Sequence, residues 1–258
     1  MLSQILLSRR TLWPVLWLGT SIWAQTVPPI ASQPHGAVPL RPLAPVLLRY
    51  RVRSSNFPWR LNAELLWQTD GRNYEASLVL RALGMERSQR SRGRISASGV
   101  EPVHFAEMMR TEEHARFDHG HRVVAFQPPQ PEVSLSAGAQ DRLSVLPQLA
   151  TLFASDPSRY TSGTRLRLQV VSGHGADIWQ FSVAGSETLL LPGGEQACVK
   201  LVRPADADND QRLEIWLAPR MGYVPVRVLA TEANGDQVDQ QWEGNSTPPI
   251  WGGPDVAP

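Results

Sequence analysis

The chain has 258 residues, of which 42% are hydrophobic, so it can bury a sizeable core and disorder is excluded for most of it. Its 25 basic and 24 acidic residues nearly balance, which argues against nucleic acid or an anionic membrane surface as a partner, because both attract clustered positive charge. The single cysteine, Cys198, excludes an internal disulfide. Its place in an alternating apolar run predicts a buried side chain rather than a reactive thiol.

The first 24 residues have the three parts of a secretory signal. Arg9 and Arg10 precede an apolar run, Leu12–Trp23, and the small residue Ala24 follows at a plausible cleavage point. The run is shorter than the roughly 20 residues that a spanning helix needs. We therefore expect a signal peptide over residues 1–24, a mature chain from about Gln25 without a membrane span, and a periplasmic location. The general and twin-arginine export routes both stay open.

The two ends of the expected mature chain are rich in proline. Residues 25–45 predict an extended linker, because proline fixes φ and cannot donate to a sheet ladder. The last residues, 244–258, predict a disordered tail rich in proline and glycine. Between them, residues 46–243 form the expected folded domain.

Within that domain the hydrophobic period is two. Leu61, Ala63, Leu65 and Trp67 alternate with polar residues, which is typical of a half-buried antiparallel strand. A turn at Asp70-Gly71 leads to a similar run. Further strands are expected at Tyr74–Leu80, Val103–Met109, Val123–Phe126, Leu166–Val171, Ile178–Val183, Glu187–Leu191, Ala197–Val202, Leu213–Leu217, Val224–Ala230 and Gln237–Trp242.

One segment, Asp141–Ala154, has a helical apolar face instead. Pro147 suggests that the helix begins near Val145, which places the proline in the first turn. Many strands and one apolar helix predict an α+β fold, mainly antiparallel β. We expect a curved half-barrel sheet whose concave face the helix covers.

A short segment, Glu112–His121, is the place where metal-ligand residue types gather. His114, His119 and His121 could bind zinc or copper if they converged on one point. However, Asp118-His119-Gly120 also predicts a hairpin turn, on which these side chains would splay apart into solvent. No metal signature of known spacing supports the first alternative.

Other catalytic patterns are missing from the sequence. It has no G-x-S-x-G nucleophile elbow, and Gly173-His174-Gly175 predicts a turn rather than a phosphate loop. We therefore expect a protein that is not an enzyme and needs no cofactor.

Tryptophans in or near the strand runs suggest a different function. Trp67, Trp179 and Trp216 could line a pocket for an apolar ligand, although inward aromatic side chains are also ordinary core.

Four segments in fixed order resemble the DUF3108 family of exported bacterial proteins of uncharacterised function. They are Gly93–Pro102, Gln140–Ala150, Ile215–Pro219 and Tyr223–Arg227, and the resemblance spans roughly Leu47 to Trp242. It implies a curved antiparallel sheet similar to the half-barrel of periplasmic lipoprotein carriers, with helical cover. The family supplies no catalytic residues.

The leading hypothesis is therefore a non-enzymatic periplasmic binding or carrier protein for a lipid or other apolar ligand. The alternative is an interaction module that binds a protein of the cell envelope. A metal-dependent enzyme that uses the His114–His121 region comes third.

Overall fold

The structure is a computed structural model, and it describes residues 39–82, 84–109, 111–205 and 211–249. The predicted signal peptide (1–24), residues 25–38 of the predicted linker and residues 250–258 of the predicted tail lie outside the described residues.

In the described ranges, fifteen strands form one sheet in which each strand pairs with its neighbours in the chain, except that β8 and β9 do not pair and form the two edges. The first and last strands, β1 and β15, also pair, and every pairing is antiparallel except that of β9 with β10. The strands are β1 (Val46–Ser54), β2 (Phe57–Thr69), β3 (Asn73–Ala82), β4 (Met85–Ser96), β5 (Gly99–Met108), β6 (Glu112–Asp118), β7 (Val123–Gln127), β8 (Val133–Ser134), β9 (Gln140–Asp141), β10 (Arg165–Val171), β11 (Ala176–Leu191), β12 (Gly194–Arg203), β13 (Arg212–Ala218), β14 (Val224–Thr231) and β15 (Gln237–Ser246).

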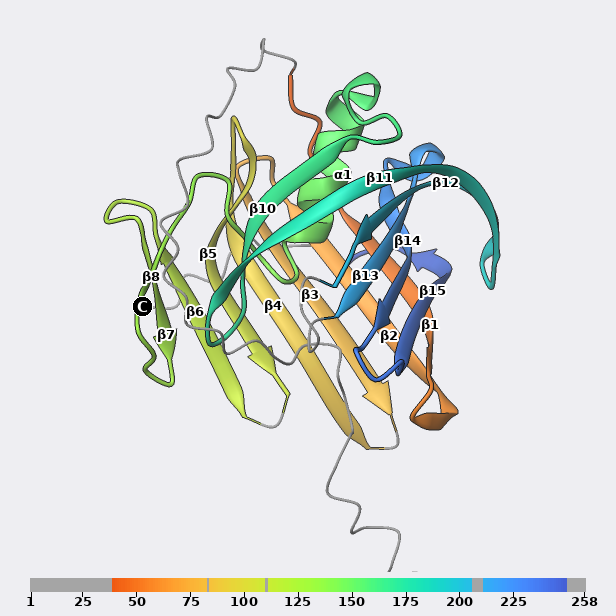
Figure 1. Ribbon diagram of the computed structural model, residues 1–258, viewed down its shortest axis with the longest axis horizontal. Coiled ribbons are helices and arrows are strands. Elements are labelled where there is room, and N and C mark those ends of the chain that lie inside the picture. The colour runs from red at the N-terminus through yellow and green to blue at the C-terminus, as the bar shows by residue number, and fades with distance from the viewer. Residues whose placement is uncertain (1–38, 83, 110, 206–210, 250–258) are drawn as a thin grey trace, which may run out of the picture.

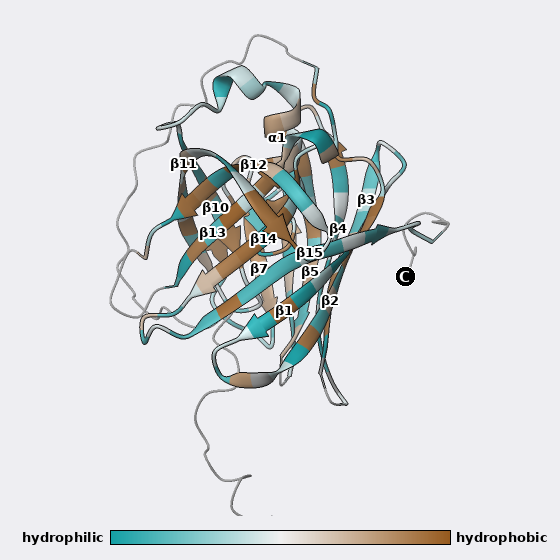
Figure 2. Cartoon of the chain, turned by 90° about the vertical axis from the view of Figure 1, so that its right-hand side faces the viewer, coloured by the Kyte–Doolittle hydropathy of each residue, from teal (hydrophilic) through white to brown (hydrophobic). Residues whose placement is uncertain are grey.

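The period-two pattern explains which face of the sheet is buried. On β2, the side chains of Leu61, Ala63 and Leu65 are buried, whereas the intervening Asn62 is exposed. Figure 2 shows short hydrophobic and hydrophilic segments alternating along β1 and β2. The mainly antiparallel sheet of the sequence prediction is confirmed.

Helix α1 (Val145–Ser155) begins at the residue that Pro147 suggested. Residues 141–144 are not helical. Instead, the carboxylate of Asp141 accepts hydrogen bonds from the backbone N–H groups of Leu143 and Ser144, at 2.9 and 2.7 Å. This short turn brings the chain from strand β9 into the helix.

The sheet curves around α1 (Figure 1). The helix contacts β5 on one wall and β14 on the other. Most of its side chains are buried, including Leu149, Ala150 and Phe153, which are at most 1% exposed. The helix therefore fills much of the concave side of the sheet and is more than a lid over it.

The sheet is not closed, and glutamine side chains on β9, β10 and α1 link these elements to β5 and to the segment at β8. The amide of Gln140, on β9, donates to the carbonyl of Val100, on β5, at 2.8 Å. The amide oxygen of Gln148 accepts from the backbone N–H of Val100, also at 2.8 Å. Gln169 similarly bridges Ser134 and Ser136 at 2.8 Å each. These amides satisfy strand edges that would otherwise be unpaired.

Two predicted boundaries need correction. Strand β15 continues to Ser246, past the predicted domain end at residue 243, because Leu47 on β1 pairs with it. At the other end, Leu43 lies in the predicted linker but is buried, and its carbonyl accepts a hydrogen bond from the indole of Trp67 at 2.8 Å.

Two short helical turns complete the elements, η1 (Pro157–Arg159) and η2 (Pro219–Met221). Among the described residues, we find no helix with the length and apolarity to cross a membrane.

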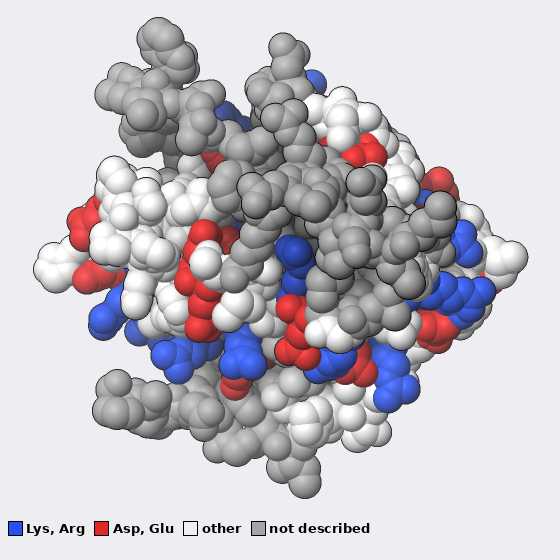
Figure 3. All heavy atoms as spheres, turned by 90° about the horizontal axis from the view of Figure 1, so that it is seen from below, with Lys and Arg blue, Asp and Glu red and all other residues white. Residues whose placement is uncertain are grey.

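Seen from below, basic and acidic side chains are interspersed (Figure 3). Opposite charges also pair on the surface: the exposed side chain of Arg81 forms ion pairs with Glu64 and Glu86.

Candidate functional site

A cavity of about 100 Å³ lies beside the start of α1. Two walls of the sheet and the helix border it and leave it partly open, and Val145 and Leu146 supply the helix side. Ten of its sixteen lining residues are apolar. The apolar side chains from the sheet come mainly from β2 and β3 on one side and β13 and β14 on the other: Ala63, Leu78, Leu80, Leu213, Val228 and Ala230.

The remaining lining residues are polar in type, although the surface that the cavity exposes is mostly apolar. Arg87 and Gln89 lie two residues apart on β4 and therefore face the same side of the sheet. Arg142, just before α1, lines the cavity as well, together with Gln211 and Gln240. The lining thus includes two guanidinium groups, and none of the described lining residues is acidic.

Burial and neighbouring charges act on Arg142 in opposite directions. Loss of solvent lowers the pKa of its guanidinium, whereas the nearby carboxylates of Glu107 and Asp177 raise it. Neither carboxylate lines the cavity. The charge of Arg142 is therefore stabilised by acidic groups that the cavity itself does not expose.

Trp179 is the predicted aromatic residue that lines the cavity. Its ring packs edge-on to Phe181, with centroids 6.1 Å apart. The guanidinium of Arg203 lies over the same ring, 4.8 Å from the centroid. These contacts hold the indole in place as part of the wall.

Trp67 is not part of the cavity wall. It faces the same side of β2 as Ala63 but lies four residues further on, about 13 Å at roughly 3.3 Å per residue. There its ring stacks on Tyr74, with centroids 4.9 Å apart. Trp67 is therefore a core residue.

Trp216 is also outside the cavity wall. It lies three residues after Leu213 on β13, so its side chain faces the opposite side of the sheet. Lys200 and Arg227 lie over its ring, at 4.7 and 4.6 Å from the centroid. Its indole N–H donates to Glu187 on β11.

A buried polar network lies beside the first turn of the helix. The hydroxyl of Ser91 donates to the carboxylate of Asp141 at 2.6 Å, and Tyr74 is hydrogen-bonded to Ser91 at 2.9 Å. Burial raises the pKa of Asp141 from 3.8 to about 6, although hydrogen bonds from Ser91 and the backbone partly oppose this shift. Burial, and then the charge of Asp141, also raise the pKa of Tyr74.

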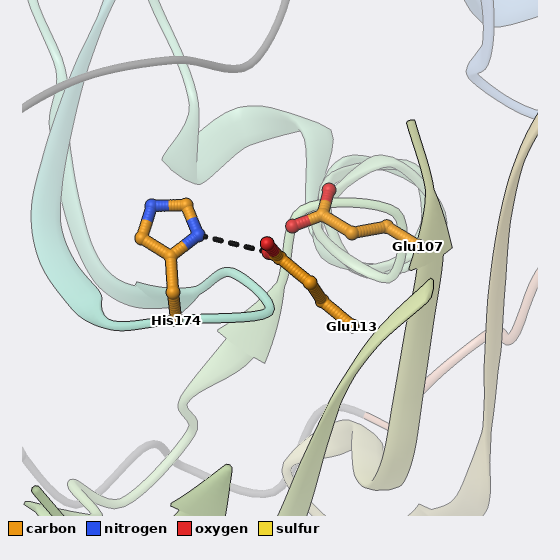
Figure 4. Close-up of side chains that lie close together, drawn as sticks. All are labelled: Glu107, Glu113 and His174. Atoms are coloured by element: carbon orange, nitrogen blue, oxygen red, sulfur yellow. Dashed lines mark hydrogen bonds and ion pairs between the residues drawn. The ribbon is translucent and has the colours of Figure 1, made fainter. Parts of the chain in front are cut away.

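Three side chains of metal-ligand type meet at a site that shares only Glu113 with the predicted segment Glu112–His121 (Figure 4). The three residues are Glu107, Glu113 and His174. Each offers one ligand atom, and these three atoms lie within 4.8 Å of one another. Glu113 pairs with Nδ1 of His174 at 3.1 Å, and Glu107 accepts from the backbone N–H of Gly173 at 2.8 Å. A cation would have to replace these contacts, which already fasten the β10–β11 turn to β5 and β6.

The predicted histidine cluster is not assembled. His114 lies 3.9 Å from Glu112, His119 bonds the carbonyl of Pro102 at 2.6 Å, and His121 pairs with Asp118 at 2.8 Å. Among the described residues these histidines form no common group of ligands. The reason is the predicted hairpin: its turn after Asp118 directs the side chains to separate partners.

Sequence reasoning missed the polar lining residues of the cavity and the carboxylate of Glu107, although Glu113 lies in the predicted segment Glu112–His121. Signals for both were present in the strand patterns. On β4, Arg87 and Gln89 are polar on the face that β3 fills with leucine, and Glu107 interrupts the buried face of β5. A polar residue at an inward position of an alternating strand marks such a site.

Comparisons with known proteins agree with this fold. No curated protein matches the chain. A beta-barrel-like protein of the domain of unknown function DUF1849 from Brucella abortus, known from its crystal structure, is similar with a TM-score of 0.50 and 12% identity, over 80% of this chain and 98% of that one. The profile of a family described as "Protein of unknown function (DUF3108)" matches residues 49–240. The chain therefore belongs to the DUF3108 family.

Proposed function

We propose that this protein is a non-enzymatic binding protein that encloses the apolar part of a small molecule or lipid in the cavity beside α1. The observation that carries the proposal is the cavity itself, whose walls are mainly apolar although it is partly open to solvent. The predicted signal over residues 1–24 supports a site of action in the periplasm.

The volume limits what can be enclosed. At about 100 Å³, the cavity is smaller than an engineered apolar cavity of roughly 150 Å³ that binds benzene. It is also below the roughly 300 Å³ at which pockets for drug-sized ligands begin. Because α1 fills much of the concave side, the proposed ligand inserts a few carbon atoms, such as the end of an acyl chain.

Calorimetric titration with hexanol tests the proposal. Ala230 lines the cavity and is 3% exposed, so Ala230→Leu places a larger side chain in the empty space. We expect saturable binding by the unaltered protein, with a negative heat-capacity change, and loss of binding in the variant. Ala63→Leu fills the same cavity from β2 and provides a second variant if the first misfolds.

Ala197→Leu is the matched control, because Ala197 lies exposed on β12, outside the cavity. It should bind hexanol like the unaltered protein. The absence of saturable binding, or equal binding by the filled and unfilled proteins, would count against the proposal.

A further inference from the structure

We infer that the outer face of β4, β5 and β6 is a docking surface for a short acidic segment of a partner protein. These strands are neighbours in the sheet (Figure 1). On β4, Gln89 borders the cavity and Ser91 bonds the buried Asp141, so both face the interior. The residues that alternate with them face solvent. This surface is separate from the cavity and from the ligand proposed for it.

Basic side chains form two neighbouring rows across this outer face. In one row, Arg92 on β4 lies opposite His104 on β5, which lies opposite Arg116 on β6. In the next row, Arg90 and His114 lie on either side of a buried residue of β5. We call the set of five residues the basic surface: Arg90, Arg92, His104, His114 and Arg116.

Two arginines of the basic surface make no contact that compensates their charge. Arg90 and Arg116 are both exposed, and within the described ranges neither makes a hydrogen bond or an ion pair. Arg92 differs, because it lies opposite Glu75 on β3 and already has a partner. Arg90 and Arg116 therefore supply the charge that a docked carboxylate meets, and the planar fork of their N–H donors suits its two oxygens.

His104 lies in a positive potential. Burial is the largest cause that lowers its pKa, and three basic neighbours lower it further: Arg92, His114 and Arg116. Glu112 acts in the opposite direction. The ring of His104 is also close to that of His114, with centroids 5.3 Å apart. A docked anion would offset this repulsion between like charges, so the basic surface favours an acidic partner.

Carboxylates at the borders limit the size of the basic surface. Glu75 borders it on β3, Glu101 on β5 and Glu112 on β6. A planar anionic membrane or a nucleic acid would meet these carboxylates as well as the arginines, because each spreads its charge over a wider area. A short acidic segment fits between them.

An extended segment also matches the spacing of the basic surface. Positions two residues apart on a strand are separated by about 6.6 Å, at roughly 3.3 Å per residue. Arg90 and Arg92 on β4, and His114 and Arg116 on β6, are related in this way. Alternate acidic side chains of an extended peptide have the same separation, so successive carboxylates meet successive basic residues.

Fluorescence anisotropy of a labelled peptide of eight aspartates tests the inference. We expect saturable binding that weakens as salt is added, because exposed charges are screened. The double variant Arg90→Gln/Arg116→Gln should bind at least about threefold more weakly. Arg60→Gln/Arg165→Gln is the matched control, since it removes the same charge from exposed positions on β2 and β10 and should bind like the unaltered protein. Circular dichroism checks that both variants are folded.

The two histidines provide a second readout. Aspartate side chains stay ionised above about pH 5, whereas protonation of His104 and His114 adds positive charge to the basic surface. Peptide binding should therefore tighten at least about twofold between about pH 8 and pH 5.5. The double variant His104→Gln/His114→Gln should lose this dependence.

The absence of saturable binding at low salt, or equal weakening by the arginine variant and its control, would overturn the inference. Tighter binding to phosphatidylglycerol vesicles than to the peptide would also overturn it, because the partner would then be a membrane. Neither result affects the proposed binding of an apolar group in the cavity.

Discussion

Asp141 has two roles that compete with each other. As a carboxylate it accepts hydrogen bonds from Leu143, Ser144 and Ser91, which orders the turn into α1. As a fully buried acid it is more easily accommodated when neutral, and burial raises its pKa to about 6. Because the folded state holds the proton more tightly than the unfolded state, the contribution of Asp141 to stability decreases as pH rises from about 4 to about 6.

Asp141→Asn should remove this pH dependence, since asparagine can still accept the backbone hydrogen bonds but has no proton to lose. The shift from 3.8 to about 6 corresponds to about 3 kcal/mol. The free energy of unfolding of the variant relative to the original protein should therefore improve by about 2 kcal/mol of this between pH 4 and pH 6.5, because the unfolded aspartate is already partly ionised at pH 4. Urea denaturation at the two pH values measures this difference, and an identical difference at both would contradict the assignment.

Gly173 allows the β10–β11 turn to approach β6. A Cβ atom at this position would lie 2.5 Å from Cβ of Glu113 and 3.1 Å from a carboxylate oxygen of Glu107. Gly173→Ala should therefore reduce the free energy of unfolding by about 1–3 kcal/mol, in the range of other overpacked sites. Chemical denaturation measures the loss.

Gly175 provides the control for that substitution, because it lies in the same turn and a Cβ there would have no atom within 4 Å. Gly175→Ala should change stability much less. Equal effects of the two substitutions would show that the close approach at Gly173 is unimportant.

Individual residues were predicted less well than their strands. The alternation on β2 and β13 identified Trp67 and Trp216 as strand residues. It did not show how far along its strand each residue lies from the cavity, or which face of the strand borders the cavity. Trp67 lies too far along β2, and Trp216 faces the opposite side. Likewise, Glu107 and Gly173 are 66 positions apart, and only the folded sheet brings them together.

At the level of elements, α1 determines how much of the interior remains empty. Leu149 is fully buried, whereas Leu152 on the same helix is only partly buried. We expect Leu149→Ala to lower the free energy of unfolding by about 2–5 kcal/mol and Leu152→Ala to lower it by clearly less. Thermal or urea denaturation of the two variants measures the difference. Similar losses would argue against a helix packed inside the sheet.

The elements themselves were largely predictable from the sequence. Period-two runs and turn signals identified most of the long strands, and Pro147 indicated the start of α1. Strands β1 and β4 were not among the expected strands, and the two strands expected at Ile178–Val183 and Glu187–Leu191 are one strand, β11. The ends of elements were less certain. Strand β15 extends to Ser246 because its partner β1 continues, which is a contact between the two ends of the domain.

At the scale of the whole molecule, a single open sheet encloses both a helix and a cavity. The glutamine bridges between its elements involve residues tens of positions apart, such as Gln140 with Val100. Such pairs leave no local pattern in a sequence, so the sequence predicted a curved sheet but not how its ends meet. The cavity likewise depends on the packing of α1 against both walls, which composition and periodicity do not determine.

The central claim is that an apolar group binds in this cavity. Methyl resonances of the protein, recorded during titration with hexanol, test the claim at the level of single residues. We expect saturable shifts at Leu78, Leu213 and Val228, which line the cavity, and no comparable shifts at Leu43 or Leu61, which are buried elsewhere. Ala230→Leu should abolish the shifts. The absence of saturable shifts at the cavity residues, or equal shifts throughout the core, would contradict the account.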